Sequence, residues 1–264
     1  MTPTSATPLV FITGASSGIG QALALRYHEA GWRVALVARR RETMQAWVAG
    51  LCWSHDRFRV YTADVSVADE ILTAAQACLA HQGLPDVVIA NAGISIGMDT
   101  AERTDLDVMA RTLSVNNVGM AATFHPFIAP MRQRGSGQLV GIASVAAIRG
   151  LPGHGAYCAS KAGVVSYCES LRGELRGSGI QVLTIAPGFI DTPLTRGNRY
   201  PMPFLMSAPA FANRAFRAIQ SGRSYAVIPW QMGVVAKLLR VLPNAWFDRL
   251  MQGRGRKARA QSSD

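Results

Sequence analysis

Short apolar runs alternate with helix-like segments along most of the chain, and this alternation is the feature that most limits how it can fold. Several runs are apolar on both faces, such as 34–37 and 87–89, which is typical of strands buried inside a parallel sheet. Parallel neighbours need right-handed crossovers, and these place helices on both faces of the sheet. The sequence therefore predicts an α/β fold with a doubly wound parallel sheet.

Seven strands and six helices are predicted for the body of the chain. The strands cover 9–13, 33–38, 58–62, 86–90, 138–142, 181–186 and 225–228, and the helices 17–30, 41–52, 66–81, 102–133, 155–177 and 207–221. The sequence has no internal repeat and no linker rich in Pro, Gly or Ser, so residues 1–229 are expected to form a single domain.

Charge and cysteine usage exclude several classes of protein. The 27 Lys and Arg exceed the 16 Asp and Glu, but they are spread without interleaved aromatic residues, so we expect no nucleic-acid binding. The four cysteines have no C-x-x-C spacing and the histidines never pair at metal-ligand intervals, which predicts neither a disulfide framework nor a metal site. No stretch reaches the roughly 18 apolar residues of a membrane span. We expect a cytoplasmic protein.

A glycine-rich loop, Thr-Gly-Ala-Ser-Ser-Gly-Ile-Gly at 13–20, follows the first predicted strand and opens the first helix. Glycine permits a tight turn and the close approach of a pyrophosphate, which then lies at the positive end of the helix. A plain glycine-rich turn is the alternative. We expect a nucleotide cofactor to bind at Gly14, Ser16, Ser17, Gly18, Ile19 and Gly20.

The end of the second strand indicates which nucleotide cofactor binds. An NAD site places an acidic residue there to accept from the ribose hydroxyls, but this chain has Ala38 followed by Arg39, Arg40 and Arg41. A solvated helix start would also explain the arginines. The missing acid favours NADP, with Arg39 on the 2′-phosphate, Arg40 assisting and Ser16 or Ser17 adding a hydroxyl.

Tyr157 and Lys161 lie four residues apart on a predicted helix, so both side chains emerge on one face. A nearby ammonium lowers the pKa of a tyrosine from about 10 and favours proton exchange near neutrality. Ser144 ends the fifth strand, where it could orient a carbonyl oxygen or serve as a cap or turn residue. Asn116 lies inside a long predicted helix and could anchor a water beside Lys161, or be exposed or kink-forming.

Together these motifs resemble the short-chain dehydrogenase/reductase family over about residues 8–228. The matching elements are the 13–20 loop, Asp64-Val65, Asn91-Ala92-Gly93, the Asn-Asn-Val-Gly of 116–119, Ser144, the Tyr-Cys-Ala-Ser-Lys of 157–161, and Pro187-Gly188 with Thr192. The resemblance implies a Rossmann fold and a reacting tetrad of Asn116, Ser144, Tyr157 and Lys161.

The same resemblance implies further cofactor contacts. Asp64 and Val65 would border the adenine, and Asn91, Ala92 and Gly93 would form the edge of the fourth strand. Thr192 would contact the nicotinamide amide, and Lys161 would also hold the nicotinamide ribose. Pro187, Gly188 and Ile190 would complete the cofactor site.

These residues predict an NADP(H)-dependent oxidoreductase that interconverts a carbonyl and an alcohol. The segment at about 189–222 should be the lid over the nicotinamide, and its apolar, Met-containing composition favours an apolar substrate, although simple packing of the loop explains it equally. A nucleotide-binding regulator or scaffold with little turnover is the alternative. The helices at 102–133 and 155–177 carry more apolar surface than one sheet face needs, and the resemblance to the family implies that they form the core of a homodimer or homotetramer.

The end of the chain carries no motif of the family. Residues 230–252 predict two amphipathic helices broken at Pro243, with Asn244 as the cap of the second. Residues 253–264 form a basic tail, expected to be disordered, with Arg254, Arg256, Lys257 and Arg259. The apolar helices must be covered by the substrate cleft, a subunit seam or a membrane surface; we favour packing over peripheral membrane contact.

Overall fold

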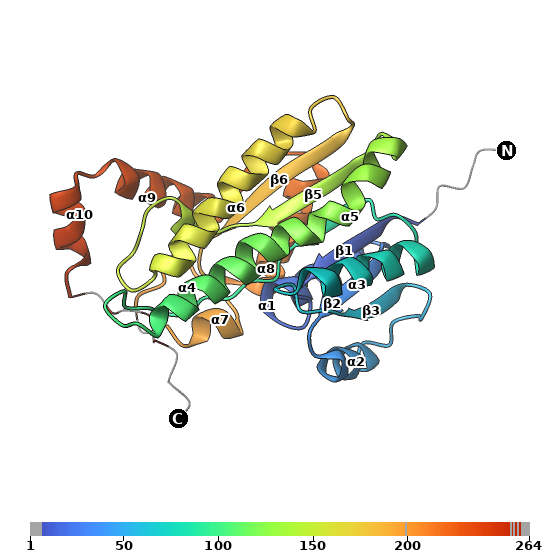
Figure 1. The fold of residues 1–264 in the computed structure, drawn as a ribbon, viewed down its shortest axis with the longest axis horizontal. Helices are drawn as coiled ribbons and strands as arrows, with labels where there is room; N and C mark the ends of the chain where they lie inside the picture. The colour runs from blue at the N-terminus through green and yellow to red at the C-terminus, as the bar shows by residue number, and fades with distance from the viewer. Residues whose placement is uncertain (1–6, 199, 254, 256, 258, 260–264) are drawn as a thin grey trace.

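The structure, a computed structural model, describes residues 7–198, 200–253, 255, 257 and 259. Seven parallel strands form one sheet in the order β3-β2-β1-β4-β5-β6-β9 (Figure 1). They are β1 (Leu9–Thr13), β2 (Arg33–Ala38), β3 (Phe58–Thr62), β4 (Val87–Ala90), β5 (Gly137–Ile142), β6 (Ile180–Pro187) and β9 (Tyr225–Ile228). The order confirms the predicted doubly wound sheet.

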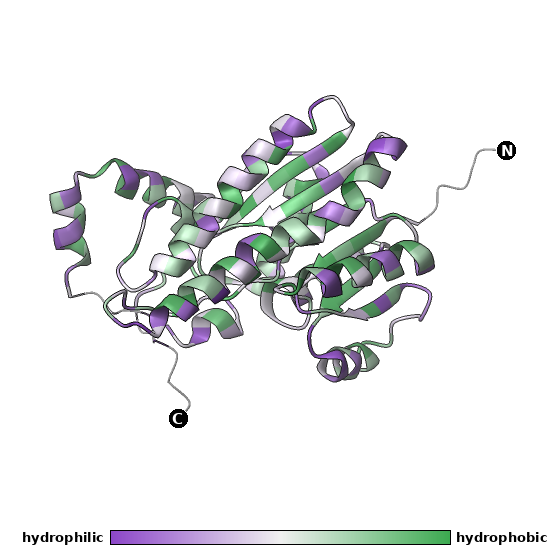
Figure 2. Cartoon of the chain, viewed as in Figure 1, coloured by the Kyte–Doolittle hydropathy of each residue, from purple (hydrophilic) through white to green (hydrophobic). Residues whose placement is uncertain are grey.

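Helices cover both faces of the sheet because its strands place apolar side chains into a core on each side. Figure 2 shows the mostly hydrophobic colour of strands such as β1. One core contains α1 (Gly18–Glu29), α2 (Arg41–Ala49) and α8 (Ala208–Gln220). The other core contains α3 (Ala68–His81), α5 (Gly119–Arg134) and α6 (Gly155–Glu174). Alternate residues of each strand therefore enter different cores: Phe11 packs with the α5 side, and Val10 and Ile12 with the α1 side.

The helix predicted at 102–133 is not continuous. It consists of α4 (Asp105–Leu113), a π-helical turn (Ser114–Val118) and α5. The turn contains Asn116, whose buried side chain bonds to the backbone of Ile94. Such π-turns recur at functional sites. The wider turn thus accommodates a polar side chain that a hydrophobic pattern cannot predict.

The segment after β6 forms a small second sheet that the sequence did not predict. Strand β7 (Ile190–Asp191) pairs with β8 (Met206–Ser207), and the short helix α7 (Pro193–Arg196) lies between them in sequence. Thr192 begins α7 in a reciprocal capping arrangement with Thr195. This arrangement explains how a segment with few long apolar runs holds a defined path.

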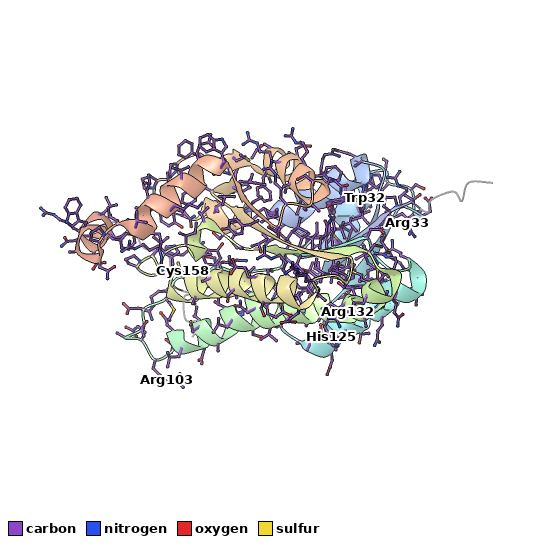
Figure 3. The ribbon with its side chains drawn as sticks, turned by 90° about the horizontal axis from the view of Figure 1, so that it is seen from above. Trp32, Arg33, Arg103, His125, Arg132 and Cys158 are labelled. Atoms are coloured by element: carbon purple, nitrogen blue, oxygen red, sulfur yellow. The ribbon has the colours of Figure 1, made fainter. Side chains whose placement is uncertain are left out.

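Two helices follow β9: α9 (Trp230–Val241) and α10 (Asn244–Met251). Both lie at one end of the molecule, away from β3, in the two views of Figures 1 and 3. The prediction that Asn244 caps α10 was wrong. Asn244 is the first helical residue, and its Oδ1 accepts a hydrogen bond from Arg149. No helix in the described part of the chain is long and apolar enough to cross a membrane.

The tail differs from the predicted disorder where it is described. Lys257 donates to the Leu194 carbonyl oxygen at 2.9 Å, and Arg259 forms an ion pair with Asp105 at 2.7 Å. Arg254 and Arg256 lie outside the described residues. Two cations of the tail thus bind a carbonyl oxygen and a carboxylate of the body, whereas the whole tail was expected to be disordered.

Candidate active site

The glycine loop turns between β1 and α1 in a backbone conformation that residues with a Cβ rarely adopt. Gly14 and Gly18 have φ angles of 68° and 55°, in the left-handed region that favours glycine. A Cβ on Gly20 would lie 2.2 Å from the Gly14 carbonyl oxygen. The loop therefore packs tightly at the N-terminus of α1. Within the loop Ser17 is exposed, and it precedes the helix without capping it. This arrangement fits a pyrophosphate.

Strand order reverses between β1 and β4, and Asn91 joins the two strand ends there. Its Nδ2 donates to the carbonyl oxygens of Thr13 at 3.0 Å and Gly14 at 3.3 Å. The Thr13 hydroxyl oxygen in turn accepts from the backbone N–H groups of Asn91 and Ala92. Asn91 thus fixes the glycine loop at the crevice where open α/β sheets bind ligands.

Arg39 and Asp64 face each other at one end of this crevice. Arg39 Nη1 lies 3.5 Å from Asp64 Oδ2, and the Arg39 side chain is 58% exposed. Partial burial raises the pKa of Asp64, but hydrogen bonds from Ser66 and the charge of Arg39 outweigh it and hold that pKa below its usual value. Asp64 is therefore an anion, while Arg39 remains in solvent with only a weak surface pairing.

Lys161 is buried on α6, and its Nζ donates to the Ile142 carbonyl oxygen at 2.8 Å. Burial lowers the pKa of Lys161 from 10.5 to about 8. Burial also raises the pKa of Tyr157 to about 12, although a hydrogen bond with Ser144 partly opposes it. The expected lowering of the tyrosine pKa is thus wrong for this structure. Desolvation dominates, and Lys161 Nζ lies 5.9 Å from the centroid of the Tyr157 ring.

Ser144 serves one of the roles considered from the sequence, that of a cap. Its Oγ accepts from the Ala146 N–H at 3.1 Å and so caps the short 3₁₀ turn Val145–Ala147. It also interacts with the Tyr157 hydroxyl. The cap therefore orients the serine beside the tyrosine.

Asn116 is buried and acts on its neighbours through its side chain. Its Oδ1 accepts from the Ile94 N–H at 2.8 Å, and its Nδ2 donates to the Ile94 carbonyl oxygen and to Ser160 Oγ. Both amide hydrogens are thus taken by protein groups. Asn116 is a positioning residue that holds the chain beyond β4 near Lys161, and a Cβ on Gly93 would touch both of them.

A cleft of about 270 Å³ joins these groups. It is lined by all the sequence-predicted cofactor and tetrad residues except Gly20, which packs under the loop, and Asn116, which lies behind the wall. Sequence reasoning missed Ile94, Arg111 and Thr195, which also line it. Arg111 lies one helical turn before Val115, another lining residue that the sequence did not predict, so the sequence carried no signal for Arg111.

A second cavity, of about 250 Å³, adjoins the cleft and has mostly apolar walls. Five residues line both spaces: Ser144, Tyr157, Gly188, Leu194 and Thr195. The reacting groups therefore lie where the two cavities meet.

Helix α9 forms one wall of the second cavity through Met232, Val235, Ala236 and Leu239. The inner face of α9 thus covers the second cavity. Phe189, Leu194 and Tyr200 of the lid segment also line the cavity, whereas Phe204 and Leu205 are exposed. Only part of the lid's apolar composition therefore serves the cavity.

Arg149 holds α9 and α10 against the turn that follows Ser144. Its Nη1 donates to the carbonyl oxygens of Leu239, Arg240 and Leu242, and its guanidinium lies 3.9 Å from the centroid of the Phe247 ring. Cations stabilise helix C-termini by pairing with unsatisfied carbonyls. The sequence contained no signal for this residue, because its partners lie about ninety residues away.

The family model of short chain dehydrogenases matches residues 8–202. An uncharacterized oxidoreductase of Myxococcus xanthus is 39% identical over 90% of this chain and 93% of its own length. Dehydrogenase/reductase SDR family member 7B of Mus musculus is 30% identical over 97% of this chain and 83% of its own. A short-chain dehydrogenase/reductase of Burkholderia phymatum, solved in complex with NAD, superposes with a TM-score of 0.80 at 25% identity, over 88% of this chain and 92% of that one.

Fold, site and relatives define a class: an oxidoreductase that acts on CH–OH and C=O groups with NAD(P). Within that class the chain belongs to the short-chain dehydrogenase/reductase family.

Proposed function

We propose that the protein is an NADP(H)-dependent enzyme that interconverts an apolar carbonyl compound and its alcohol, with Tyr157 as the acid and base. The observation that carries this proposal is that Ser144 and Tyr157 line both cavities. A carbonyl group that enters through the apolar cavity meets the two hydroxyls beside the cofactor cleft.

The bound cofactor supplies or accepts the hydride, and the protein handles the oxygen and its proton. In the direction of reduction, Ser144 orients the carbonyl oxygen and the Tyr157 hydroxyl donates its proton to it. Because the pKa of Tyr157 is about 12, the group is protonated at neutral pH. Lys161 then stabilises the phenolate by its charge, while the donors it does not spend on Ile142 remain for the cofactor's ribose. Asn116 positions the chain next to the water that returns the proton.

The preference for NADP rests on the charges at the adenosine end of the cleft. Arg39 and Arg40 line it, and Ala38 ends β2 where an acid would repel a 2′-phosphate. A charged hydrogen bond contributes roughly 1.5–3 kcal/mol, or about 10- to 150-fold in binding. We therefore expect kcat/KM to favour NADPH over NADH by about tenfold or more, although the Burkholderia relative was solved with NAD.

The variant Arg39→Ala tests this preference. It should remove most of the NADPH advantage and leave the kinetics with NADH nearly unchanged, because only the phosphate contact is lost. Arg41→Ala is the matched control: Arg41 begins α2 and does not line the cleft. Equal use of both cofactors by the wild type would contradict the assignment.

A panel of carbonyl compounds with NADPH tests the substrate class. We expect long-chain or polycyclic ketones to be reduced with higher kcat/KM than small polar ones, because the second cavity is mostly apolar. A preference for small charged substrates would refute the apolar assignment. Tight NADPH binding with slow turnover of every compound would instead favour the regulator or scaffold.

The proposal also includes self-association and a cytoplasmic location. We expect a homodimer or homotetramer through α5, α6 and the π-helical turn before α5, where Tyr167 of α6 and Val118 of the turn are exposed, and sedimentation velocity tests this. The four cysteines are free thiols, as expected for a cytoplasmic protein.

A further inference from the structure

The outer face of α9 and α10 carries six large apolar side chains that are exposed in the described part of the chain. They are Trp230, Val234, Leu238 and Val241 on α9, and Trp246 and Leu250 on α10. The α9 residues follow a spacing of four, four and three, so they form one stripe along the helix. The exposed fractions of the six side chains run from 41% to 77%. We call these six residues the C-terminal apolar face.

This face is more apolar than the other exposed surfaces of the helices. On α4, the π-helical turn and α6, where the sequence predicts subunit contacts, the exposed large apolar residues are Leu106, Val118 and Tyr167. Contiguous apolar patches on a protein surface mark sites for another protein or a membrane. We therefore treat the C-terminal apolar face as a docking surface.

The charges around the face identify that occupant. Residues 230–251 contain three cations, Lys237, Arg240 and Arg249, and a single acid, Asp248. In the described part of the chain none of these cations forms an ion pair. A second copy docked on the same face would bring like charges together, which opposes association. Anionic lipid headgroups attract such cations.

The geometry of α9 also fits a lipid surface. Its twelve residues span about 18 Å, which is much shorter than the roughly 30 Å of a hydrocarbon core. An amphipathic helix of this kind lies in the plane of the interface, where tryptophan side chains are favoured. Trp230 begins the α9 stripe and Trp246 lies on α10, so an aromatic ring is present on each helix.

Arg149 keeps the face in one orientation. It joins the residue that follows α9 to the first residue of α10, through the Leu242 carbonyl oxygen at 2.7 Å and Asn244 Oδ1 at 3.0 Å. The two helices therefore present their apolar side chains from a defined corner rather than from a loose tail, and Figure 3 shows them extending from the end of the molecule.

From these observations we infer that the C-terminal apolar face docks the protein on anionic membrane surfaces as a peripheral, non-spanning attachment. The opposite face of α9 lines the apolar cavity through Met232 and Leu239. A consequence, which rests on the proposed function, is that the enzyme takes apolar substrates from the adjoining lipid leaflet.

Co-sedimentation with vesicles tests the docking. The full-length protein is mixed with vesicles of phosphatidylcholine alone, or of phosphatidylcholine with phosphatidylglycerol, at low and high salt. We expect pelleting with the anionic vesicles that weakens as salt screens the cations. The double variant Leu238→Glu/Val241→Glu should lower the fraction bound by about tenfold or more, with an unchanged thermal midpoint because both side chains are already exposed.

Leu106→Glu is the matched control, since Leu106 is 46% exposed on α4, outside the face; it should pellet like the wild type. Equal pelleting of the wild type and the double variant would overturn the inference, and so would a wild type that pellets with neither vesicle. A wild-type dimer that the double variant converts to a monomer, without vesicle binding, would assign the face to a second copy. Pelleting without carbonyl turnover would retain the docking and refute the proposed function.

Discussion

Replacing Lys161 with methionine separates the cost of a buried charge from its use in catalysis. Lys161 is 5% exposed, and burial lowers its pKa from 10.5 to about 8. In the unfolded chain the amine keeps its proton up to about pH 10.5, so between about pH 8 and 10.5 the unfolded state binds more protons. Raising the pH through this window therefore stabilises the folded wild type, and the methionine variant lacks this gain.

The size of the effect follows from the pKa difference. A shift of one unit corresponds to about 1.4 kcal/mol, so a shift from 10.5 to about 8 makes the free energy of unfolding depend on pH by about 3 kcal/mol in total. Lys161→Met also loses the hydrogen bond to the Ile142 carbonyl oxygen, which shifts stability by a constant amount in this range. The difference between wild type and variant should thus change by about 3 kcal/mol from about pH 7 to about pH 10.5, in favour of the wild type at high pH.

Urea unfolding at the two pH values measures this difference. Lys237→Met is the matched control, because Lys237 is exposed on α9 and should show no such dependence. The Tyr157 pKa of about 12 affects both proteins alike and cancels in the comparison. Lys161→Met should also lose most of its turnover at every pH.

A stability difference that stays constant from neutral to high pH would refute the reasoning. It would mean that Lys161 keeps an ordinary pKa in the folded protein and that its ammonium group beside Tyr157 is not desolvated.

Two other substitutions have clear expected outcomes. Gly20→Ala places a Cβ 2.2 Å from the Gly14 carbonyl oxygen, and overpacking of about 1–3 kcal/mol should weaken NADPH binding by roughly 5- to 150-fold in a fluorescence titration. Gly173→Ala, at an α6 position with open space around it, should bind NADPH normally. Arg149→Ala removes the hydrogen bonds to the end of α9, so urea unfolding should show a loss of about 1–3 kcal/mol and the KM for apolar ketones should rise; an unchanged KM would argue against a role for α9 at the cavity.

The sheet could be predicted from the sequence because its strands are buried on both faces. The alternating apolar runs match β1, β2, β3 and β9 to the residue. The prediction of a continuous helix at 102–133 was wrong at Asn116, whose buried side-chain amide forms a hydrogen bond with the backbone of Ile94, 22 residues away in the sequence. Periodicity reports which face of an element is apolar, and it carries no information on such a polar contact between distant segments.

The candidate site divides in the same way. The glycine loop and the Tyr157–Lys161 pair are local patterns, and their residues meet around one cleft. The pKa values could not be predicted, because they depend on burial: spacing predicted a lowered tyrosine pKa, but desolvation raises it to about 12. Arg149 and Lys257 could not be assigned either, since their partners come from distant parts of the chain.

The variant Tyr157→Phe tests the central claim most directly, because it removes only the proposed proton donor. Positioned proton transfer contributes about 10²–10⁴-fold to the rate, so turnover of an apolar ketone should fall by at least about two orders of magnitude, while NADPH binds as in the wild type. Tyr167→Phe, a half-exposed tyrosine on the same helix, should keep full activity. Wild-type turnover in Tyr157→Phe would contradict the account.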